Sequence, residues 1–299
     1  MAKRRKSSLW AGVLLLLCPA FITLGFWASR PPASLLPSTP ATDIATSGGQ
    51  TSIRIASWNL RQLGARASTD LRMVARIITD NNFDIVAIQE VQHDGAGVDR
   101  LLNTLGPPWR GTSVSPESRS GERLTFIYRG DRASEIATPM NLIGATPQVF
   151  ERVPYCATFR AGNFDFELIT AHLSWGDIRQ RQGEMKALAG LIFSKAMGQA
   201  EKDLIVLGDL NEQKARPNLG YMAAVDWRSV VTEGTNLSSR EIYDHIVFSP
   251  KYTTEYLNRT GVVRFDESLF GNRDKEAAEA VSDHRPIWAD FATNLPDDD

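Results

Sequence analysis

Acidic, amide and imidazole side chains recur at the ends of apolar runs along this sequence. Near the C-terminus, Asp283 and His284 come just before residues 287–291, which alternate like a half-buried strand. Neighbouring residues at a strand end point to opposite sides, so the carboxylate can bind a cation while the imidazole addresses a reacting oxygen. A turn that is capped by its own aspartate explains the same residues, and the other clusters decide between these interpretations.

Two further clusters follow strongly apolar segments. The run at residues 83–88 leads to Glu90, and a carboxylate at such a place is costly unless it is paired or bound to a cation. Glu90 is therefore a metal candidate, with a salt-bridged glutamate as the alternative. The run at residues 204–208 leads to Asp209 and Asn211. In an extended segment these two face the same side and can hold or orient a water or a metal-bound oxygen.

Two other strand ends carry weaker candidates. Asn59 and Arg61 follow the predicted strand at residues 53–58. The amide oxygen of Asn59 suits a metal or a bound carboxylate, and the guanidinium of Arg61 suits a phosphate. His172 follows the predicted strand at residues 166–171. Taken alone, each has a plain structural explanation, an asparagine turn or a histidine that only packs.

Two more acids lie close to apolar strands. Asp244 falls within the strand predicted at residues 242–248, whose alternation turns Asp244 to one face and Tyr243 and His245 to the other. We interpret His245 as incidental. Glu122 precedes an apolar strand and, by itself, is equally explained as a solvated residue of a charged turn.

These candidates need a scaffold of many strands and a few helices, and the composition allows it. The chain has 299 residues, of which 42% are hydrophobic, so it can bury one large core or two small ones. Five of the 33 Lys and Arg residues fall in the first thirty positions, which leaves 28 against 35 Asp and Glu. This acidic balance argues against a general nucleic-acid-coating protein. It does not exclude an enzyme whose carboxylates hold divalent cations.

The N-terminus differs from the rest. A basic run at residues 3–6 precedes an almost uninterrupted apolar run at residues 9–28, about as long as the ~20 helical residues that span a bilayer. We expect residues 1–30 to be a signal sequence or an uncleaved signal-anchor helix, with a buried core helix as the alternative. The remainder would then be exported, to the periplasm or the outside, and held at the membrane if the leader stays.

Composition also divides the rest of the chain. Residues 31–51 are rich in Pro, Ser and Thr and predict a linker. We expect a catalytic domain at residues 52–293 and an acidic tail at residues 294–299.

Seven motifs, in this order, resemble those of the endonuclease/exonuclease/phosphatase superfamily and, within it, the deoxyribonuclease I branch. They are Trp58-Asn59-Leu60-Arg61, Gln89-Glu90-Val91, Glu122 ahead of Phe126-Ile127-Tyr128-Arg129, His172-Leu173, Gly208-Asp209-Leu210-Asn211, Tyr243-Asp244 and Ser282-Asp283-His284-Arg285-Pro286. The resemblance covers residues 52 to 292. It implies an α+β fold, a four-layer α/β/β/α sandwich of two mostly antiparallel sheets with outer helices, and the strand-rich order is compatible with it.

The resemblance also implies a metal site. Glu90 would bind a catalytic Mg²⁺ or Mn²⁺, with Asn59 in support and Asp283 completing the acidic site. Ca²⁺ is a further possible cofactor, although the calcium sites and the disulfide of the branch have no match here. Arg61 and Arg152 would bind phosphates of the polymer.

Two carboxylate–imidazole pairs are implied in the same way. His284, kept basic by Asp244, would act at the attacking water, and His172, paired with Glu122, would lie on the other side of the phosphate. Such an arrangement suits in-line displacement, in which one oxygen loses a proton and another gains one.

Some positions depart from the branch or stay open. Asp209 and Asn211 would orient either the water or a second metal. Gln92 stands where the deoxyribonuclease branch usually has an arginine that reaches into the minor groove, and Ser120 stands where it has a tyrosine. Metal-dependent phosphodiester cleavage is therefore better supported than contact with duplex DNA.

We therefore predict an exported metal-dependent endonuclease that cleaves DNA with low sequence specificity, as a monomer without an obligate protein partner. A second interpretation is a phosphodiesterase or phosphatase acting on phospholipids, as in the sphingomyelinase-like branch, or on inositol phosphates. A third is a binding domain without catalysis, which predicts a broken site, whereas every acid and imidazole position is filled.

Overall fold

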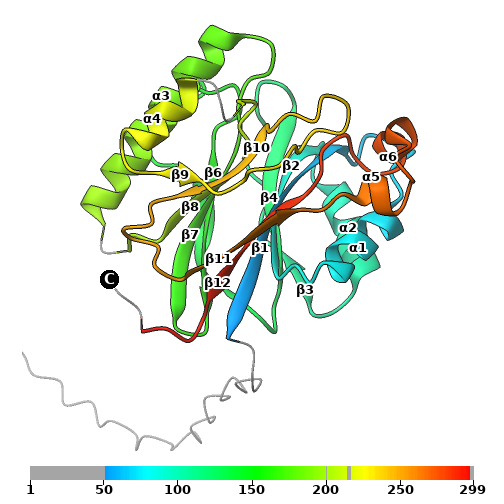
Figure 1. Cartoon of the computed structure of the whole chain (residues 1–299), viewed down its shortest axis with the longest axis horizontal. Coiled ribbons are helices and arrows are strands. Elements are labelled where there is room, and N and C mark those ends of the chain that lie inside the picture. Colours follow the sequence, from blue (N-terminus) through cyan, green and yellow to red (C-terminus); the bar gives the residue numbers. More distant parts are fainter. Residues whose placement is uncertain (1–50, 200, 214–216, 297–299) are drawn as a thin grey trace, which may run out of the picture. The chain divides into compact units, whose positions relative to one another are not determined.

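Two six-stranded β-sheets lie face to face in the computed structural model, which describes residues 51–199, 201–213 and 217–296 (Figure 1). The first sheet has the order β11 (Tyr256–Val262), β12 (Ile287–Ala292), β1 (Ser52–Leu63), β2 (Ile85–Gln92), β4 (Glu122–Arg129) and β3 (Trp109–Gly111). The second has the order β5 (Ser134–Asn141), β6 (Tyr155–Ala161), β7 (Phe164–His172), β8 (Leu204–Asp209), β10 (Asp244–Phe248) and β9 (Arg228–Ser229).

The predicted leader at residues 1–30 lies outside the described residues. So do residues 31–50 of the predicted linker and residues 297–299 of the predicted tail. The bounds of the catalytic domain stay a prediction.

Each sheet has one parallel pair at its centre. β1 runs parallel to β2, and β7 runs parallel to β8, while all other neighbours among the described strands are antiparallel. The carboxyl ends of two parallel strands meet at the same edge of their sheet. The four strands that carry Asn59, Glu90, His172 and Asp209 therefore deliver these residues in pairs, one pair from each sheet.

The face between the sheets changes from apolar to polar along the strands. In β1, Ile53 and Ile55 enter the core between the sheets, whereas Ala56 and Trp58 pack on the outer face, as the period of two requires. Toward one end of the sandwich the inner row becomes polar, with Ser57, Asn59, Gln89, Thr170, His172, Asp209 and Asp244. These side chains are buried, so they need hydrogen-bond partners, which Gln89 finds both in its own sheet, at Ser57, and across the gap, at Thr170.

Helices cover both outer faces, which completes the four layers and confirms the predicted fold class. α1 (Leu71–Asp80), α2 (Ala96–Leu105), α5 (Phe265–Ser268) and α6 (Asp274–Ala280) pack on the first sheet. α3 (Ile178–Gly198) and α4 (Gly220–Ala223), which follows the 3₁₀ turn Pro217–Leu219, pack on the second.

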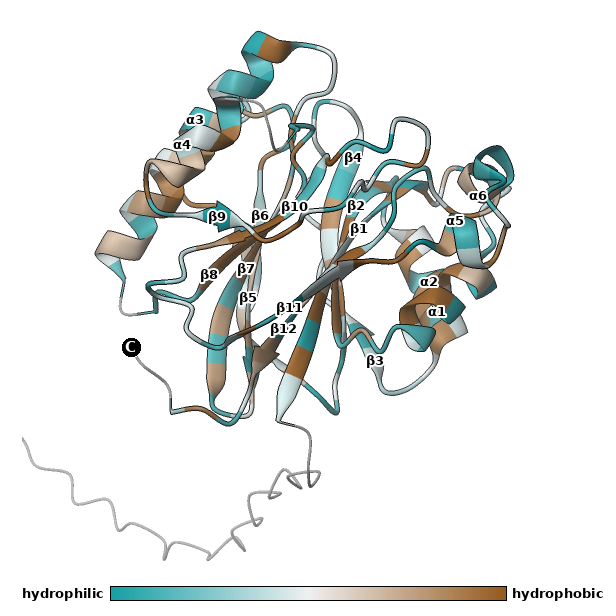
Figure 2. Cartoon of the chain, viewed as in Figure 1, coloured by the Kyte–Doolittle hydropathy of each residue, from teal (hydrophilic) through white to brown (hydrophobic). Residues whose placement is uncertain are grey.

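The two main covering helices have mixed surfaces. Figure 2 shows both apolar and hydrophilic residues on α1 and on α3, as expected of helices that pack one face on a sheet. Among the helices of the described residues, none combines the length and the apolar character that crossing a bilayer demands.

Candidate active site

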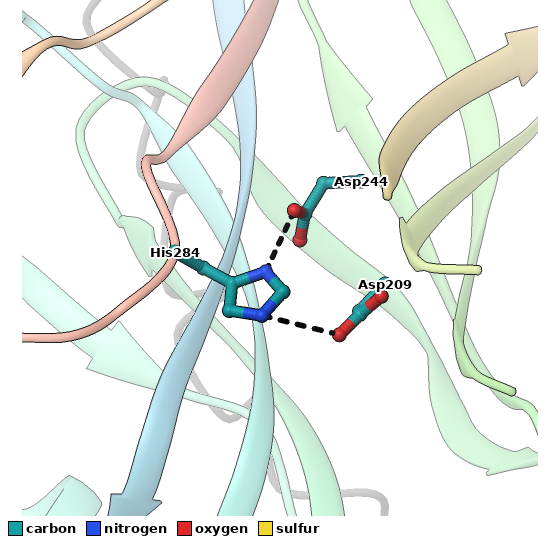
Figure 3. Close-up of side chains that lie close together, drawn as sticks. All are labelled: Asp209, Asp244 and His284. Atoms are coloured by element: carbon teal, nitrogen blue, oxygen red, sulfur yellow. Dashed lines mark hydrogen bonds and ion pairs between the residues drawn. The ribbon is translucent and has the colours of Figure 1, made fainter. Parts of the chain in front are cut away.

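His284 lies between two buried carboxylates at the polar end of the sandwich (Figure 3). Its Nδ1 donates to Asp244 Oδ2 at 2.8 Å, and its Nε2 lies 3.7 Å from Asp209 Oδ2. Burial by itself would lower the pKa of His284, but the negative charges of Asp244, Asp209 and Asp283 outweigh it and raise this pKa to about 10. This raised pKa favours the protonated imidazole at neutral pH.

The segment before β12 is tied to β1, and this fixes His284. Trp58 Nε1 donates to the carbonyl oxygen of His284 at 2.8 Å. Ser282 Oγ donates to the carbonyl oxygen of Asn59 at 2.6 Å and accepts from the His284 amide at 3.2 Å. Sequence reasoning had given no role to Trp58 or Ser282, although both stand inside the motifs that were singled out.

His172 forms the second carboxylate–imidazole pair. Its Nδ1 lies 3.0 Å from Glu122 Oε2, and its Nε2 lies 3.6 Å from Asp209 Oδ2. One oxygen of Asp209 thus faces the Nε2 atoms of both histidines. Both pairs also bridge the sheets, because His172 and Asp244 come from the second sheet, whereas Glu122 belongs to the first and His284 immediately precedes β12.

Arg152 lies behind Glu122. Its guanidinium donates to both carboxylate oxygens, from Nη2 to Oε1 at 3.1 Å and from Nε to Oε2. Burial raises the pKa of Glu122, but the close contact with His172 and the hydrogen bonds from Arg152 prevail and lower it to about 2. We had expected Arg152 to bind substrate phosphate. In the structure Arg152 is buried and paired with Glu122, and its two-pronged geometry serves this carboxylate of the protein. Its contact with a phosphate stays a prediction.

Glu90 reaches the site through an irregularity in β2. Its φ of +59° falls in the left-handed region, and the pairing of β2 with β4 shifts register between Ile88 and Val91. Bulges and strained backbone of this kind gather at functional sites. The Glu90 oxygens accept from Asn59 Nδ2 at 2.9 Å and from the Gln62 amide at 2.9 Å.

Asn59 joins Glu90 to the histidine cluster. The same Nδ2 that serves Glu90 also donates to Asp209 Oδ2 at 3.1 Å. Its Oδ1 accepts from the Arg61 amide at 3.0 Å, and Arg61 Nε lies 3.7 Å from Asp283 Oδ2. Arg61 and Asp283 are each nearly two-fifths exposed, so this pair forms the open rim of the site.

Asn211 does not follow the extended path that we expected. Its φ is +52°, and its Nδ2 donates to the carbonyl oxygen of Leu173 at 2.8 Å. The Asn211 amide donates to Asp209 Oδ1 at 3.0 Å. Asn211 therefore fixes Asp209 and joins the ends of β7 and β8.

Hydrogen bonds and close ion pairs thus connect all the predicted site residues into one network. Its members are Asn59, Arg61, Glu90, Glu122, Arg152, His172, Asp209, Asn211, Asp244, Asp283 and His284. The structure brings these residues together; the catalytic role of each remains a proposal.

Two donor sets suit a divalent cation. In the described part of the chain, Asp209, Asp244 and His284 offer ligand atoms that all lie within 4.8 Å of one another. Asp244 Oδ1 is buried and has no hydrogen-bond partner among these residues. The predicted set around Glu90 offers a carboxylate whose oxygens each keep an acceptor site beyond the single donor that they have. Oxygen donors suit Mg²⁺ and Ca²⁺, and a histidine ligand must first be neutral.

We expect the Glu122 cluster to make stability depend on pH. The pKa of Glu122 is lowered in the folded state, so its contribution is complete above about pH 4.5 and is lost as the pH falls toward 2. In wild type this effect should lower the free energy of unfolding by up to about 3 kcal/mol between pH 7 and pH 2, and Glu122→Gln should abolish that part of the loss. Urea unfolding at a series of pH values between 2 and 7 measures this free energy. Glu117→Gln, an exposed glutamate nearby, is the control, and equally steep curves for wild type and Glu122→Gln would contradict the prediction.

Comparison with known proteins places this geometry in a family. Residues 56–284 match the Endonuclease/Exonuclease/phosphatase family. The chain is 30% identical over 283 residues to "Deoxyribonuclease" of Thioalkalivibrio sp. (strain K90mix), covering 87% of this chain and 74% of that one. It is 24% identical over 265 residues to "Deoxyribonuclease-1" of Equus caballus, covering 79% of this chain and 91% of that one.

A solved structure shares the fold. The endonuclease/exonuclease/phosphatase family protein from Bacteroides thetaiotaomicron superposes with a TM-score of 0.59 at 18% identity, covering 82% of this chain and 99% of that one. With the sandwich, the bridging carboxylate–imidazole pairs and the matched region together, the chain belongs to the Endonuclease/Exonuclease/phosphatase family.

Proposed function

We propose that this chain is a divalent-metal-dependent phosphodiester hydrolase, and specifically an endonuclease that cleaves DNA with low sequence specificity. The observation that carries the proposal is the convergence of His172 and His284 on one oxygen of Asp209. Each histidine has a carboxylate at its other ring nitrogen. The relatives named deoxyribonuclease support DNA as the substrate.

The two imidazoles divide the proton transfers. His284 is held as an imidazolium by Asp244 and Asp209, so it can donate a proton or a hydrogen bond to a phosphate oxygen. His172, backed by Glu122 and Arg152, faces the same oxygen of Asp209 and can accept or donate the proton of the second oxygen. In-line displacement needs one proton transfer at each of two oxygens.

Glu90 and Asn59 would hold the cation, with Asp283 at the rim. The buried group of Asp209, Asp244 and His284 is a second place where the cation could bind once His284 has lost its proton. Bound Mg²⁺ or Mn²⁺ would stabilise the negative charge that grows on the phosphate. Asn59 keeps the Glu90 carboxylate close to Asp209. A cation at Glu90 and the two histidines would therefore act on the same phosphate.

A nicking assay tests the proposal. Purified full-length protein is incubated with supercoiled plasmid in Mg²⁺, Mn²⁺ or EDTA, and separately with sphingomyelin vesicles. We expect nicking that depends on the metal and stops in EDTA. Lipid turnover without nicking would move the assignment to the phospholipid phosphodiesterases, and inactivity on every phosphodiester would favour a binding domain.

Arg61 should distinguish a polymer from a small substrate. It stands at the open rim, where a phosphate beyond the reacting one would pass. A charge-assisted contact contributes ~1.5 to 3 kcal/mol, so Arg61→Ala should lower kcat/KM for plasmid by about 10- to 150-fold. Turnover of bis(4-nitrophenyl) phosphate should fall far less. Arg72→Ala, an exposed arginine of α1, is the control, and equal losses on both substrates would count against a polymer substrate.

We also propose that the catalytic part is exported, on the strength of the basic and apolar runs at the N-terminus. Fractionation of producing cells checks this. Recovery of the protein in the cytoplasmic fraction alone would contradict it.

A further inference from the structure

A small cavity opens beside the histidine cluster, on the side of α3. It has a volume of about 200 Å³ and is lined by Trp175, Gly176, Arg181, Asn211, Gln213 and Tyr243. We propose that this cavity is a subsite for one nucleobase of the substrate strand, next to the reacting phosphate, with the indole of Trp175 as its stacking surface. The inference rests on the proposed phosphodiester hydrolase function.

The residues that line the cavity lie next to the strand ends that carry the catalytic candidates. Trp175 follows His172 after β7, Asn211 follows Asp209 after β8, and Tyr243 directly precedes Asp244 of β10. Backbone hydrogen bonds join these ends, because the Leu173 amide donates to Asp209 and the Leu210 amide donates to Tyr243. Any occupant therefore lies next to the strand ends that carry His172, Asp209 and Asp244.

The size of the cavity favours a single ring system. Pockets that bury a drug-sized ligand measure roughly 300 to 1,000 Å³, so about 200 Å³ is too small for such a ligand. Trp175 is 65% exposed, which leaves most of its indole surface accessible. Tyr243 packs against the indole edge to face, with ring centroids 5.3 Å apart and planes at 79°. This contact holds the indole in place, and a fixed aromatic ring stacks on a base at low entropic cost.

The remaining walls are polar, and this favours a base over a lipid chain. Asn211 and Gln213 contribute amides, and Arg181 contributes a guanidinium. Arg181 is buried and fixed, because its Nε donates to Glu212 Oε2 at 3.1 Å and its Nη1 donates to the Ser174 carbonyl at 3.1 Å. Fixed polar groups opposite an aromatic face suit the edge and the face of a nucleobase.

Substitution of Trp175 tests the subsite in the full-length protein. The two substrates are a single-stranded oligodeoxynucleotide and a chain of the same length built from abasic deoxyribose phosphates. Stacking on an aromatic ring stabilises a bound base, so Trp175→Ala should lower kcat/KM for the oligodeoxynucleotide by about 10-fold or more. It should leave cleavage of the abasic chain unchanged. Trp175→Phe keeps an aromatic face and should recover most of the activity, and Phe193→Ala, an exposed aromatic of α3, is the control.

Binding in EDTA separates this inference from the proposed function. Fluorescence anisotropy of a labelled oligodeoxynucleotide should show weaker binding for Trp175→Ala than for wild type. Binding that depends on Trp175 without cleavage of any nucleic acid would support the subsite while contradicting the hydrolase. Cleavage that Trp175→Ala reduces equally on both substrates would overturn the subsite and leave the hydrolase standing. The subsite would also be overturned if Trp175→Ala abolished sedimentation of the protein with phosphatidylcholine vesicles but left its oligonucleotide binding unchanged.

Discussion

Replacing His284 with alanine should lower plasmid nicking by about 10² to 10⁴-fold, the range for a lost proton-transfer group. His284 is buried and lies between Asp244 and Asp209, where a solvent water cannot readily take its place. Initial nicking rates at saturating metal measure the effect. His93→Asn, at an exposed histidine with a φ of +57° that asparagine also tolerates, is the matched control and should nick like wild type.

The partner of His284 gives this prediction a second readout. Asp244→Asn preserves the shape of the side chain but removes the charge that raises the pKa of His284. That pKa should fall toward its ordinary value, so the protonated form is lost at lower pH and the alkaline limb of the rate profile moves down with it. The double variant should be little worse than either single one, because the pair acts as a unit. An unchanged pH profile in Asp244→Asn would contradict the assigned pairing.

Gly208→Ala should cost a large part of the stability of the fold. Gly208 has a φ of +149°, and a Cβ built there lies 1.9 Å from the Ala171 carbonyl oxygen of the neighbouring strand. A strained backbone and an overpacked core each cost roughly 1 to 3 kcal/mol. Their sum is a large part of the 5 to 15 kcal/mol by which domains of this kind are typically stable. Urea unfolding monitored by circular dichroism, together with the soluble yield, checks the loss.

A second glycine supplies the comparison. Gly190 lies in the interior of α3, is exposed, and has nothing within 4 Å of a built Cβ. Gly190→Ala should therefore stabilise the chain by about 0.5 to 1 kcal/mol. An unfolding midpoint for Gly208→Ala equal to that of wild type would show that β7 and β8 need not approach so closely. The consequence for the site is direct, because this close approach brings His172 level with Asp209.

Much of the site was predictable because its residues terminate apolar runs. Asn59, Glu90, His172 and Asp209 follow buried segments that the structure confirms as β1, β2, β7 and β8. Period-two alternation identified the strands but not which strand pairs with which, since pairing is a contact between distant segments. The sandwich of two sheets therefore came from the family resemblance, and the parallel pair at the centre of each sheet was not predicted.

Other features left too little signal in the sequence. β5 and β11 were not predicted, because both are largely exposed edge strands with no regular alternation. The left-handed backbone at Glu90 and Asn211 depends on a bulge and on tertiary hydrogen bonds. The contact of Arg152 with Glu122 was not predicted, because an arginine before a strand looks the same whether it will meet a phosphate or a carboxylate.

Each histidine pairs with a carboxylate from the opposite sheet. Turnover should therefore depend on how the two sheets are aligned. A small sliding of one sheet over the other would separate both pairs while every strand kept its own hydrogen bonds. The hydrophobic layer between the sheets includes Phe126, Phe159 and Phe166. Its packing sets the distance between the sheets and, through it, the geometry of both carboxylate–imidazole pairs. Mild denaturants should therefore abolish activity at concentrations that leave the secondary structure intact.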